Sequence, residues 1–521
     1  MSSLRLPPWL VLALALPAAS ARAAEVPVAD TPGLLAAIAA AKPGDTIVLA
    51  SGTYDVKQNK IACEAAGTAD APIVVRAAER GQARIRFDGI EGFHVRGPHW
   101  HFEGLDIEGV CADDNLCEHA FHITGAADGA QVRHCRLHGY NAQIKANGEP
   151  IGPNDSYVWP DDVIVEYSEF FNEAPRQTGN PVTPIDIVGG QRWIVRGNFI
   201  HDHAKAGGDN ISYAAFLKGH SKDGLFERNL VACELLHTGF VRLGLSLGGG
   251  GTGPDSICED GACKPEHERG LLRNNIIVNC PADVGIYINA AADTKILNNT
   301  LYNTTGVDMR FAETTGLVAN NLLDGKIRDR DGAVSSKMNN LAEVPQSDFM
   351  AWFVDPANYD FTPKNAGALV DLGLTVPEVL DDYCANLRDD GMHDIGAIEY
   401  DLGGCVGGLP APPDGSDPGT TGDPGTTGDP GTTTADPTGP ATTNSTDPTG
   451  GPDPTGAGGT TGADPSGSGT SPGDTGSSAT DPAGGNADDA GCGCRSDADP
   501  ASAGGLLALL ALAARRRRSS H

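Results

Sequence analysis

The stretch AAFLKGHSKDGLFERNLV, residues 214–231, places Lys218, His220 and Lys222 directly after a short apolar run. A lysine amine or an imidazole can take a proton from carbon when it is held beside its substrate. Lys218 is therefore a candidate general base, and His220 is a candidate acid or base. The alternative is that Lys218 is a surface lysine in a weak ion pair and that His220 is an exposed loop residue. The choice depends on the elements that position these side chains.

A repeat surrounds this stretch. Seven segments share one pattern, in which apolar residues stand three positions before and two positions after an aligned residue that is Asn in five of the seven cases. The spacing of the aligned residue ranges from 22 (Asn299 to Asn321) to 46 (Asn229 to Asn275), which is typical of repeat architectures. The aligned residues are Cys135, Ser168, Asn198, Asn229, Asn275, Asn299 and Asn321. The recurring Asn predicts a hydrogen-bonded ladder at one corner of a stack.

A second family of short strands precedes these segments and alternates apolar and other residues with a period of two, as a strand with one buried face does. Its members are FHIT, AQIK, IDIV, FLKG, LSLG, IYIN and MRFA. Parity turns one set of side chains outward, and neighbouring coils are about 4.8 Å apart. We predict that this set forms a stripe: His122, Gln143, Lys145, Asp186, Phe216, Lys218, Ser246, Tyr287, Asn289 and Arg310.

The stripe yields the expected binding residues. Asp186 should lie between Lys145 and Lys218, with each lysine one coil away, and Ser246 and Tyr287 continue the stripe as substrate contacts. Arg242, upstream of the glycine-rich LSLGGGG stretch, has the parity to face outward as well. The alternative is a structural ladder of charges without a ligand.

Coils of short strands with variable turns predict an all-β fold, a right-handed single-stranded parallel β-helix over residues 24–408. Its open end would expose strand edges and needs a cap. Residues 31–42 supply one, since Thr31 can cap a helix, Pro32 suits its first turn, and an Ala-rich run follows.

The segment TPGLLAAIAAAKPGDTIVLASGTY (residues 31–54), with GTADAPIVVRAAE after it, resembles the β-helical polysaccharide lyases, especially the alginate lyase and chondroitinase B family. The resemblance extends loosely over residues 31–400. It implies β-elimination of an acidic glycan, in which a Lys after a short apolar strand is the base, an Arg one coil on assists, and calcium can hold the sugar carboxylate. FLKGHS matches this pattern at Lys218, and Arg242 falls in the following coil. The family's calcium-holding glutamates have no counterpart, because Tyr213-Ala214-Ala215 stands there.

The leading expectation is thus a lyase with Lys218 as base, Arg242 as assisting cation and calcium as the one cofactor to consider. The rival is a non-catalytic surface adhesin or carbohydrate-binding protein that uses the stripe as a binding face. In either case the expected partner is a polysaccharide, and we expect a monomer.

The chain ends point to export. Residues 1–23 carry an early Arg, an apolar run and Ala-Arg-Ala, as a cleaved secretory signal does. Residues 409–490 contain twelve Asp, no Lys or Arg and few bulky apolar residues, which predicts a disordered stalk. The formal net charge of −31 makes a nucleic-acid partner unfavourable.

Residues 491–521 contain Cys492 and Cys494, then a short apolar run, and then four consecutive arginines near the C-terminal end. This order of parts resembles the myxobacterial C-terminal sorting signal known as MYXO-CTERM. The resemblance implies export and sorting machinery as partners, a membrane contact before processing near the two cysteines, and display at the cell surface or outer membrane. A generic tail anchor is the alternative.

Ten further cysteines lie between Cys63 and Cys405, which suits disulfides in an exported protein. Cys111 with Cys117, and Cys258 with Cys263, are close enough in sequence to clip short loops. Zinc-type spacing is absent among the ten, so disulfides are favoured over a cysteine metal site.

Overall fold

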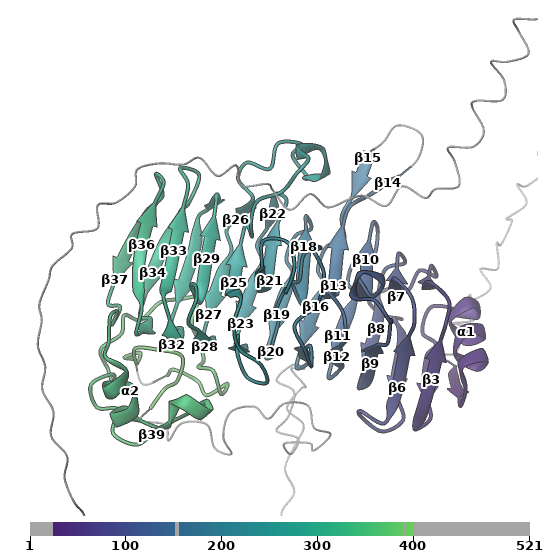
Figure 1. Ribbon diagram of the computed structural model, residues 1–521, viewed down its shortest axis with the longest axis horizontal. Helices are drawn as coiled ribbons and strands as arrows, with labels where there is room; N and C mark the ends of the chain where they lie inside the picture. Colours follow the sequence, from purple (N-terminus) through teal and green to yellow (C-terminus); the bar gives the residue numbers. More distant parts are fainter. Residues whose placement is uncertain (1–23, 152–155, 390, 401–521) are drawn as a thin grey trace, which may run out of the picture. The chain divides into compact units, whose positions relative to one another are not determined.

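Strands that recur along the chain stack on one another into three parallel sheets, which we call sheets A, B and C (Figure 1). Each coil passes through the three sheets in turn, as β2, β3 and β4 do. The structure is a computed structural model, and it describes residues 24–151, 156–389 and 391–400. The predicted signal peptide, stalk and sorting segment lie outside the described residues. The predicted β-helix is confirmed.

Sheet A consists of β1 (Glu25–Val28), β2 (Thr46–Leu49), β5 (Ile73–Ala77), β8 (Trp100–Glu103), β11 (Gln131–Arg133), β16 (Ile164–Glu166), β19 (Ile194–Arg196), β23 (Leu225–Glu227), β27 (Leu271–Arg273), β31 (Thr294–Leu297), β34 (Thr315–Ala319) and β37 (Val334–Met338). Sheet B consists of β3 (Gly52–Val56), β6 (Ala83–Phe87), β9 (Leu105–Gly109), β12 (Arg136–His138), β17 (Glu169–Phe171), β20 (Phe199–His201), β24 (Leu230–Ala232), β28 (Ile276–Cys280), β32 (Thr300–Thr304) and β35 (Leu322–Leu323).

Sheet C consists of β4 (Ile61–Cys63), β7 (Glu91–Val95), β10 (His119–Thr124), β13 (Ala142–Asn147), β18 (Ile185–Val188), β21 (Ile211–Lys218), β25 (Val241–Leu247), β29 (Ile286–Asn289), β33 (Gly306–Arg310) and β36 (Lys326–Arg330). The remaining elements are α1 (Thr31–Ala40), α2 (Gln346–Trp352), β14 (Glu149–Ile151), β15 (Ser156–Val158), β22 (Ser221–Lys222), β26 (His267–Glu268), β30 (Ala291–Ala292), β38 (Phe353–Asp355), β39 (Asp360–Pro363) and the 3-10 turns at Asp114–Leu116, Asp255–Ile257 and Pro356–Asn358.

The predicted repeat alignment is confirmed by strand register. In sheet A, Val132 pairs with Val165, and the same position continues coil by coil to Val318. In sheet B, Leu137 pairs with Phe170, and that position continues to Leu323. All of these side chains are buried, so they form a continuous apolar column inside the coils.

Helix α1 closes the N-terminal end of the column (Figure 1). It buries Leu34 and Ile38. The N-cap is Asp30, whose side chain accepts a 2.8 Å hydrogen bond from the Gly33 amide, and not Thr31 as the sequence suggested. Asp30 can do this because its backbone is extended, whereas Thr31 already belongs to the helix.

The predicted asparagine ladder runs along one corner inside the stack. Each side chain accepts a hydrogen bond from the backbone amide of the residue one coil earlier, as Asn275 does from Asn229 at 3.0 Å and Asn299 does from Asn275 at 3.0 Å. Ser168 plays the same part for Cys135. The ladder gives buried amides at the corner a partner that regular strand pairing would not supply.

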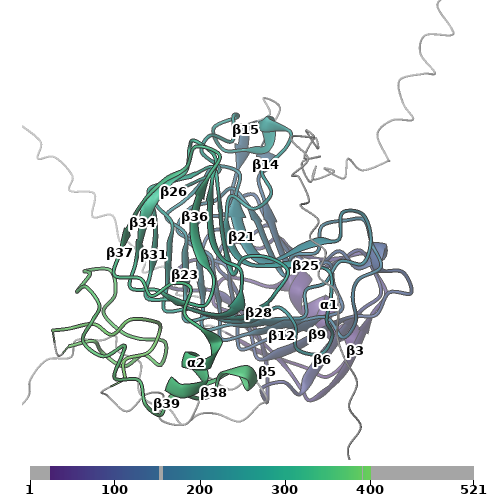
Figure 2. The ribbon, with the colours of Figure 1, turned by 60° about the vertical axis from the view of Figure 1, so that its left-hand side comes forward.

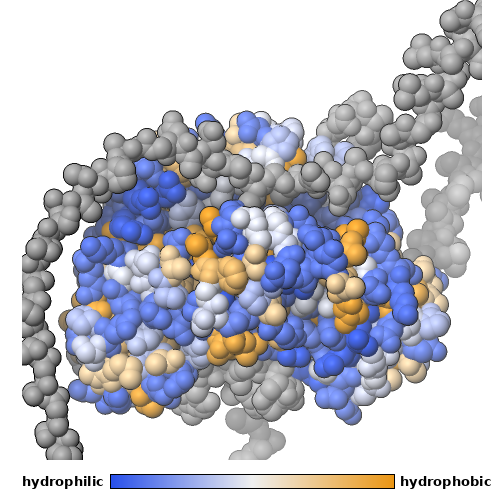
Figure 3. Space-filling model, in the orientation of Figure 1, coloured by the Kyte–Doolittle hydropathy of each residue, from blue (hydrophilic) through white to orange (hydrophobic). Residues whose placement is uncertain are grey.

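Residues 345–400 leave the stack and pack across the outer face of sheet B (Figures 1 and 2). We call this segment the brace. Its Phe349 and Phe361 are buried in one cluster with Leu230 and Leu322, which lie several coils apart. The last stacked strand among the described residues, β37, ends at Met338. The face seen in Figure 3 is mostly hydrophilic, with apolar side chains in separate small patches.

Three disulfides have both cysteines among the described residues, and they join Cys111 to Cys117, Cys258 to Cys263, and Cys233 to Cys280. The two predicted short-range disulfides, Cys111–Cys117 and Cys258–Cys263, are thereby confirmed. The third, between Cys233 and Cys280, joins two adjacent coils. Within the described ranges, no helix is both long and apolar enough to cross a bilayer.

Replacing Asn275 by Ala should lower the free energy of unfolding by at least about 2 kcal/mol, because two buried groups of Asn229 lose their acceptor. Urea denaturation followed by circular dichroism measures this. Asn358, which is exposed and bonds only to Asp355 among the described residues, is the control, and its change to Ala should have an effect within ~0.5 kcal/mol. Equal effects at both positions would contradict a structural role for the ladder.

His138 on sheet B should make stability depend on pH. Burial alone would lower its pKa, but hydrogen bonds to Asp106 (3.2 Å) and Glu173 (2.6 Å) outweigh burial and raise the pKa to about 9. The stabilisation is therefore complete below about pH 6.5 and is lost as the pH rises toward 9. His138→Gln should cost more free energy of unfolding at pH 6 than at pH 9.5, on the order of 2 kcal/mol. A cost independent of pH would contradict the assignment.

Candidate functional site

The predicted stripe is confirmed as one continuous row on the outer face of sheet C. Strand register aligns His122, Lys145, Asp186, Phe216, Ser246 and Tyr287 across six neighbouring strands. Lys218 belongs to a parallel row two residues further along, where it pairs with Val188. The coils thus bring residues that are more than a hundred positions apart in the sequence, from His122 to Tyr287, onto one face.

Lys145 and Asp186 form a direct ion pair at the centre of the row. The Lys145 Nζ donates to Asp186 Oδ1 at 2.7 Å, and both side chains are less than a tenth exposed. Two buried opposite charges in contact are held firmly, since separating either one would leave an uncompensated charge. Asp186 therefore contacts Lys145 as predicted, while the side chain of Lys218 takes a different partner.

Lys218 ends β21 and is only 2% exposed. Its Nζ lies 4.6 Å from the centre of the Phe216 ring and donates a 2.9 Å hydrogen bond to the Gly251 carbonyl. Among the described residues, no carboxylate forms an ion pair with it. The ammonium is thus held by a ring face and a backbone carbonyl, and the surface ion pair that served as the alternative is absent in the described part of the chain.

The glycine-rich stretch covers Lys218. A side chain at Gly249 would come within 3.1 Å of the Phe216 ring and 3.4 Å of Lys218 Cδ, so the backbone lies directly on these two residues. The Gly249 amide donates to Ser246 Oγ at 3.1 Å, and its carbonyl accepts from Asn289 Nδ2 at 2.8 Å. We call residues 248–252 the glycine loop. The glycine loop thus lies directly against Phe216 and Lys218.

Glu266 holds the far end of the glycine loop. Its carboxylate accepts hydrogen bonds from the Thr252 amide (2.7 Å), the Thr252 hydroxyl (2.6 Å) and the Gly219 amide (2.9 Å). His220 follows with a left-handed backbone (φ 63°) and donates from Nδ1 to the Pro265 carbonyl at 2.9 Å. His220 is thus nearly buried beside Asp260 rather than exposed, and it belongs to the wall that surrounds Lys218.

Arg242 does not join Lys218, and the prediction that it faces outward on the stripe is wrong. Its side chain is 1% exposed and donates to the carbonyls of Cys233 and Gly239, with Asp202 at 3.7 Å. Strand parity reverses near Gly244, because Leu243 packs in a cluster separate from the main column. Arg242 pairs in register with Ser212, six residues before Lys218 along β21, which is roughly 20 Å of strand.

Tyr287 and Ser246 lie where the row predicts. The Tyr287 hydroxyl accepts a 3.2 Å hydrogen bond from Arg310, and its ring lies 6.3 Å from that of Tyr213. Ser246 is fully buried beneath the glycine loop. Tyr287 is nearly buried on this face, at 8% exposed, and Ser246 supports the loop.

Trp159 was missed by the sequence analysis. A side chain at Gly189 would lie 2.1 Å from Trp159, and one at Gly148 would lie 2.6 Å away, so the indole rests on the ends of β13 and β18. Tyr157 is its neighbour, with ring centres 5.8 Å apart, and is 37% exposed. Amphipathic rings beside a polar row offer flat apolar surface with a polar edge. The conjunction of glycines at two strand ends was the available signal.

The carboxylates beside Lys218 do not fit a calcium site. Asp186 Oδ1 is bound by Lys145, and both oxygens of Glu266 accept hydrogen bonds. The carboxylates of the stretches 159–166 and 201–210 are also engaged. Asp162 pairs with Arg192, and Asp202 accepts hydrogen bonds from three backbone amides. Calcium needs six or more oxygen ligands, and the described residues here offer no free cluster.

Comparison with known proteins places the chain near polysaccharide lyases. The family model of chondroitinase B matches residues 28–150. Pectate lyase L of Dickeya chrysanthemi and that of Dickeya dadantii are each 36% identical over 85 residues, which cover 14% of this chain and 20% of each relative. The match thus spans about a fifth of the length of these relatives.

Two solved structures of polysaccharide lyases are similar to this chain. Pectate lyase Pel9A matches with a TM-score of 0.50 and 15% identity, over 70% of this chain and 90% of that one. A rhamnogalacturonan lyase has a TM-score of 0.46 and 15% identity, over 70% of this chain and 95% of that one. The chain is therefore a β-helix with local sequence similarity to polysaccharide lyases, concentrated in the family match at its N-terminal coils.

Arg242→Gln should destabilise the protein by about 3 kcal/mol, because the carbonyls of Cys233 and Gly239 would lose their charged donor in a buried place. Arg269→Gln is the control, since Arg269 pairs with Asp223 at the surface and should contribute less than about 1 kcal/mol. Urea denaturation of both variants checks this. An Arg242 variant as stable as the Arg269 variant would contradict the structural role.

Proposed function

We propose that the protein acts on an acidic polysaccharide by lyase-type β-elimination, with Lys218 as the base. The observation that carries the proposal is the placement of Lys218 on the outer face of sheet C, one coil from Asp186 and beside the row that contains Lys145 and Tyr287. The chondroitinase B family match and the local identity to pectate lyase L support the same reaction class.

The reaction would proceed through one proton transfer and one bond cleavage. The unprotonated Lys218 amine takes the C5 proton of a uronate, and the released electron pair forms the ring double bond while the bond to the leaving glycosidic oxygen breaks. That oxygen ends as a hydroxyl by taking a proton from water. A base must reach the carbon it deprotonates, so Lys218 has to leave the Gly251 carbonyl before reaction.

The glycine loop is therefore the part that would move. It touches Lys218 with backbone only, and its far end is fixed to Glu266. Opening exposes the amine and the Phe216 ring together. Arg242 has no part in this scheme, and His220, fixed by the Pro265 carbonyl, helps to hold the turn that carries Lys218.

A glycan-binding protein without catalysis is the second candidate, and one observation favours it. Lys218 is already hydrogen-bonded and covered, and Arg242 lies far from it, so the expected base and assisting cation do not converge. In that case the Lys145–Asp186 row and the Tyr157–Trp159 pair form a binding face.

The chain ends support a further part of the proposal, that the protein is exported and displayed at the cell surface. The signal-like residues 1–23, the acidic stretch 409–490 and the sorting-like residues around Cys492 and Cys494 are its basis.

Lys218→Ala should reduce formation of unsaturated uronate by roughly 100-fold or more on alginate, pectate or chondroitin, followed by ultraviolet absorbance. Lys222→Ala is the matched control, since Lys222 lies four residues away and pairs only with Glu268 among the described residues. Loss of product in both variants would contradict a specific base. Absence of product from the parent protein, with retention of one of these polymers on a column, would establish the binding function instead.

A further inference from the structure

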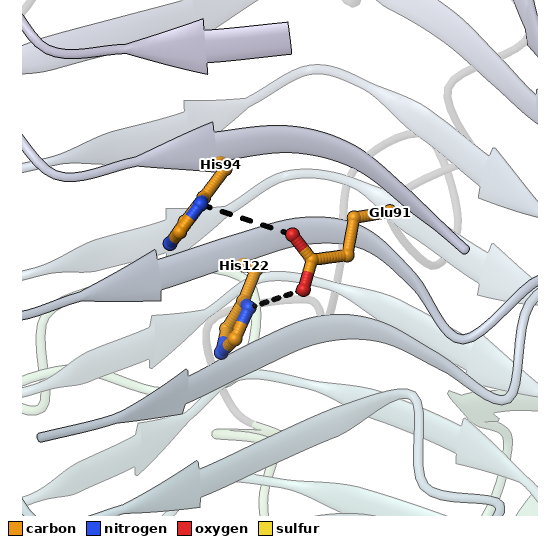
Figure 4. A group of neighbouring side chains, drawn as sticks. All are labelled: Glu91, His94 and His122. Carbon is orange, nitrogen blue, oxygen red and sulfur yellow. Dashed lines mark hydrogen bonds and ion pairs between the residues drawn. The ribbon is translucent and has the colours of Figure 1, made fainter. Parts of the chain in front are cut away.

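A cluster of two histidines and a glutamate lies on the outer face of sheet C, three and four coils before Lys218. Glu91 and His94 are on β7, and His122 is on β10. One ligand atom from each lies within 4.8 Å of the others. Figure 4 shows both imidazole rings on the same side of the sheet, each with one nitrogen turned toward the Glu91 carboxylate.

The proton on His122 is fixed by its neighbour. Asn147 donates its amide hydrogen to the Gly148 carbonyl at 2.9 Å, so its Oδ1 faces His122 Nε2 at 2.8 Å. Nε2 must therefore carry a hydrogen. In the neutral ring, Nδ1 is then a bare lone pair, and it lies 2.9 Å from Glu91 Oε1. The position between these two atoms is filled either by a proton, which makes the ring an imidazolium, or by a metal ion.

The proton on His94 is fixed in the same way. Its Nε2 lies 3.2 Å from Glu149 Oε1 and 3.1 Å from Thr124 Oγ1. The Thr124 hydroxyl already gives its hydrogen to Glu149 at 2.7 Å, so His94 Nε2 is the donor to both. Its Nδ1 is again a bare lone pair, and it accepts a 2.9 Å hydrogen bond from Lys60.

The Nδ1 atoms of both rings lie beside the Glu91 carboxylate, His122 at 2.9 Å and His94 at 3.8 Å. Glu91 Oε2 is buried and has no hydrogen-bond partner among the described residues. The nearest cation is Lys60, at 3.9 Å from Oε2, and its side chain is 45% exposed.

We propose that Glu91, His94 and His122 form a binding site for a divalent transition metal, with Zn²⁺ as the ion of choice, and that the partly exposed Lys60 ammonium stands in for it when the metal is absent. Donors on a tetrahedral zinc are roughly 3.3 Å apart. The Glu91 oxygens lie 3.8 Å from His94 Nδ1 and 2.9 Å from His122 Nδ1, which bracket that value. Imidazole nitrogens with one carboxylate suit Zn²⁺ rather than calcium.

The surroundings resemble those of functional metal ligands. Metal-binding histidines commonly donate their other ring nitrogen to a carboxylate or carbonyl oxygen, which orients the ring and raises its basicity. Glu149 does this for His94, and Asn147 does it for His122. Three protein ligands leave a fourth position open for water or for a carboxylate of an acidic glycan, next to Lys145 in the row.

This inference does not depend on the proposed lyase reaction, because it concerns metal binding in the absence of glycan. Zn²⁺ titration by calorimetry on the full chain tests it, with Cys492 and Cys494 changed to Ser throughout so that their thiols do not compete. We expect one Zn²⁺ per chain. Glu91→Gln should weaken binding by at least roughly tenfold, and Lys60→Ala should tighten it, because the competing ammonium is gone.

His101→Gln is the matched control, since it removes a histidine from the outer face of sheet A and should leave affinity unchanged. Substitution of Co²⁺ for Zn²⁺ adds a second readout, a visible absorption band typical of four-coordinate cobalt that Glu91→Gln should remove. Lack of binding by the folded parent chain, or an affinity that neither Glu91→Gln nor Lys60→Ala changes, would overturn the proposal. Because Lys60 is largely at the surface, its variant keeps the test valid even if Glu91→Gln unfolds.

Discussion

In-register stacking of successive coils is the constraint on which the whole molecule depends. Each strand finds its hydrogen-bond partners only in the coils above and below, so a one-residue slip would turn every side chain to the opposite face. The asparagine ladder fixes this register from inside, because each side chain joins the backbone of its own coil to that of its neighbour. The external rows inherit their order from it.

Function-bearing neighbours are therefore made by stacking and not by sequence proximity. Lys145 meets Asp186 across 41 residues, and His94 stacks on His122 at a ring distance of 5.0 Å. A sparse set of polar residues placed at the same position of successive coils becomes a dense face. This explains how a chain with a net charge of −31 can still gather cations and imidazoles on one side.

Sequence periodicity could predict the structural features that recur in every coil. It could not predict the places where the repeat is interrupted. The column, the ladder and the row from His122 to Tyr287 follow from parity and spacing. Arg242 did not follow, because parity reverses at Gly244 beside the apolar pair Leu243 and Tyr287. The cover over Lys218 depends on how four glycines turn back, and glycine places few steric limits on that path.

The cluster of Glu91, His94 and His122 could not be predicted from the sequence for another reason. His94 lies in EGFHVRG, one coil before the first strand that was aligned, and Glu91 depends on the turn that starts that strand. The brace was equally hidden, since its contacts join residues about 120 positions apart with no internal period. Long-range packing of an irregular segment leaves no local pattern to find.

The brace has a mechanical consequence. A force applied to the chain beyond Tyr400 would first act on the brace, where Arg388 and Glu399 are buried together. In the brace, Phe349 and Phe361 also pack against the outside of several coils at once. The load would spread across those coils in shear, and would not peel the last coil from the stack. A protein tethered by its C-terminal side could in this way bear drag while its N-terminal coils, with His94 and Lys145, stay undistorted.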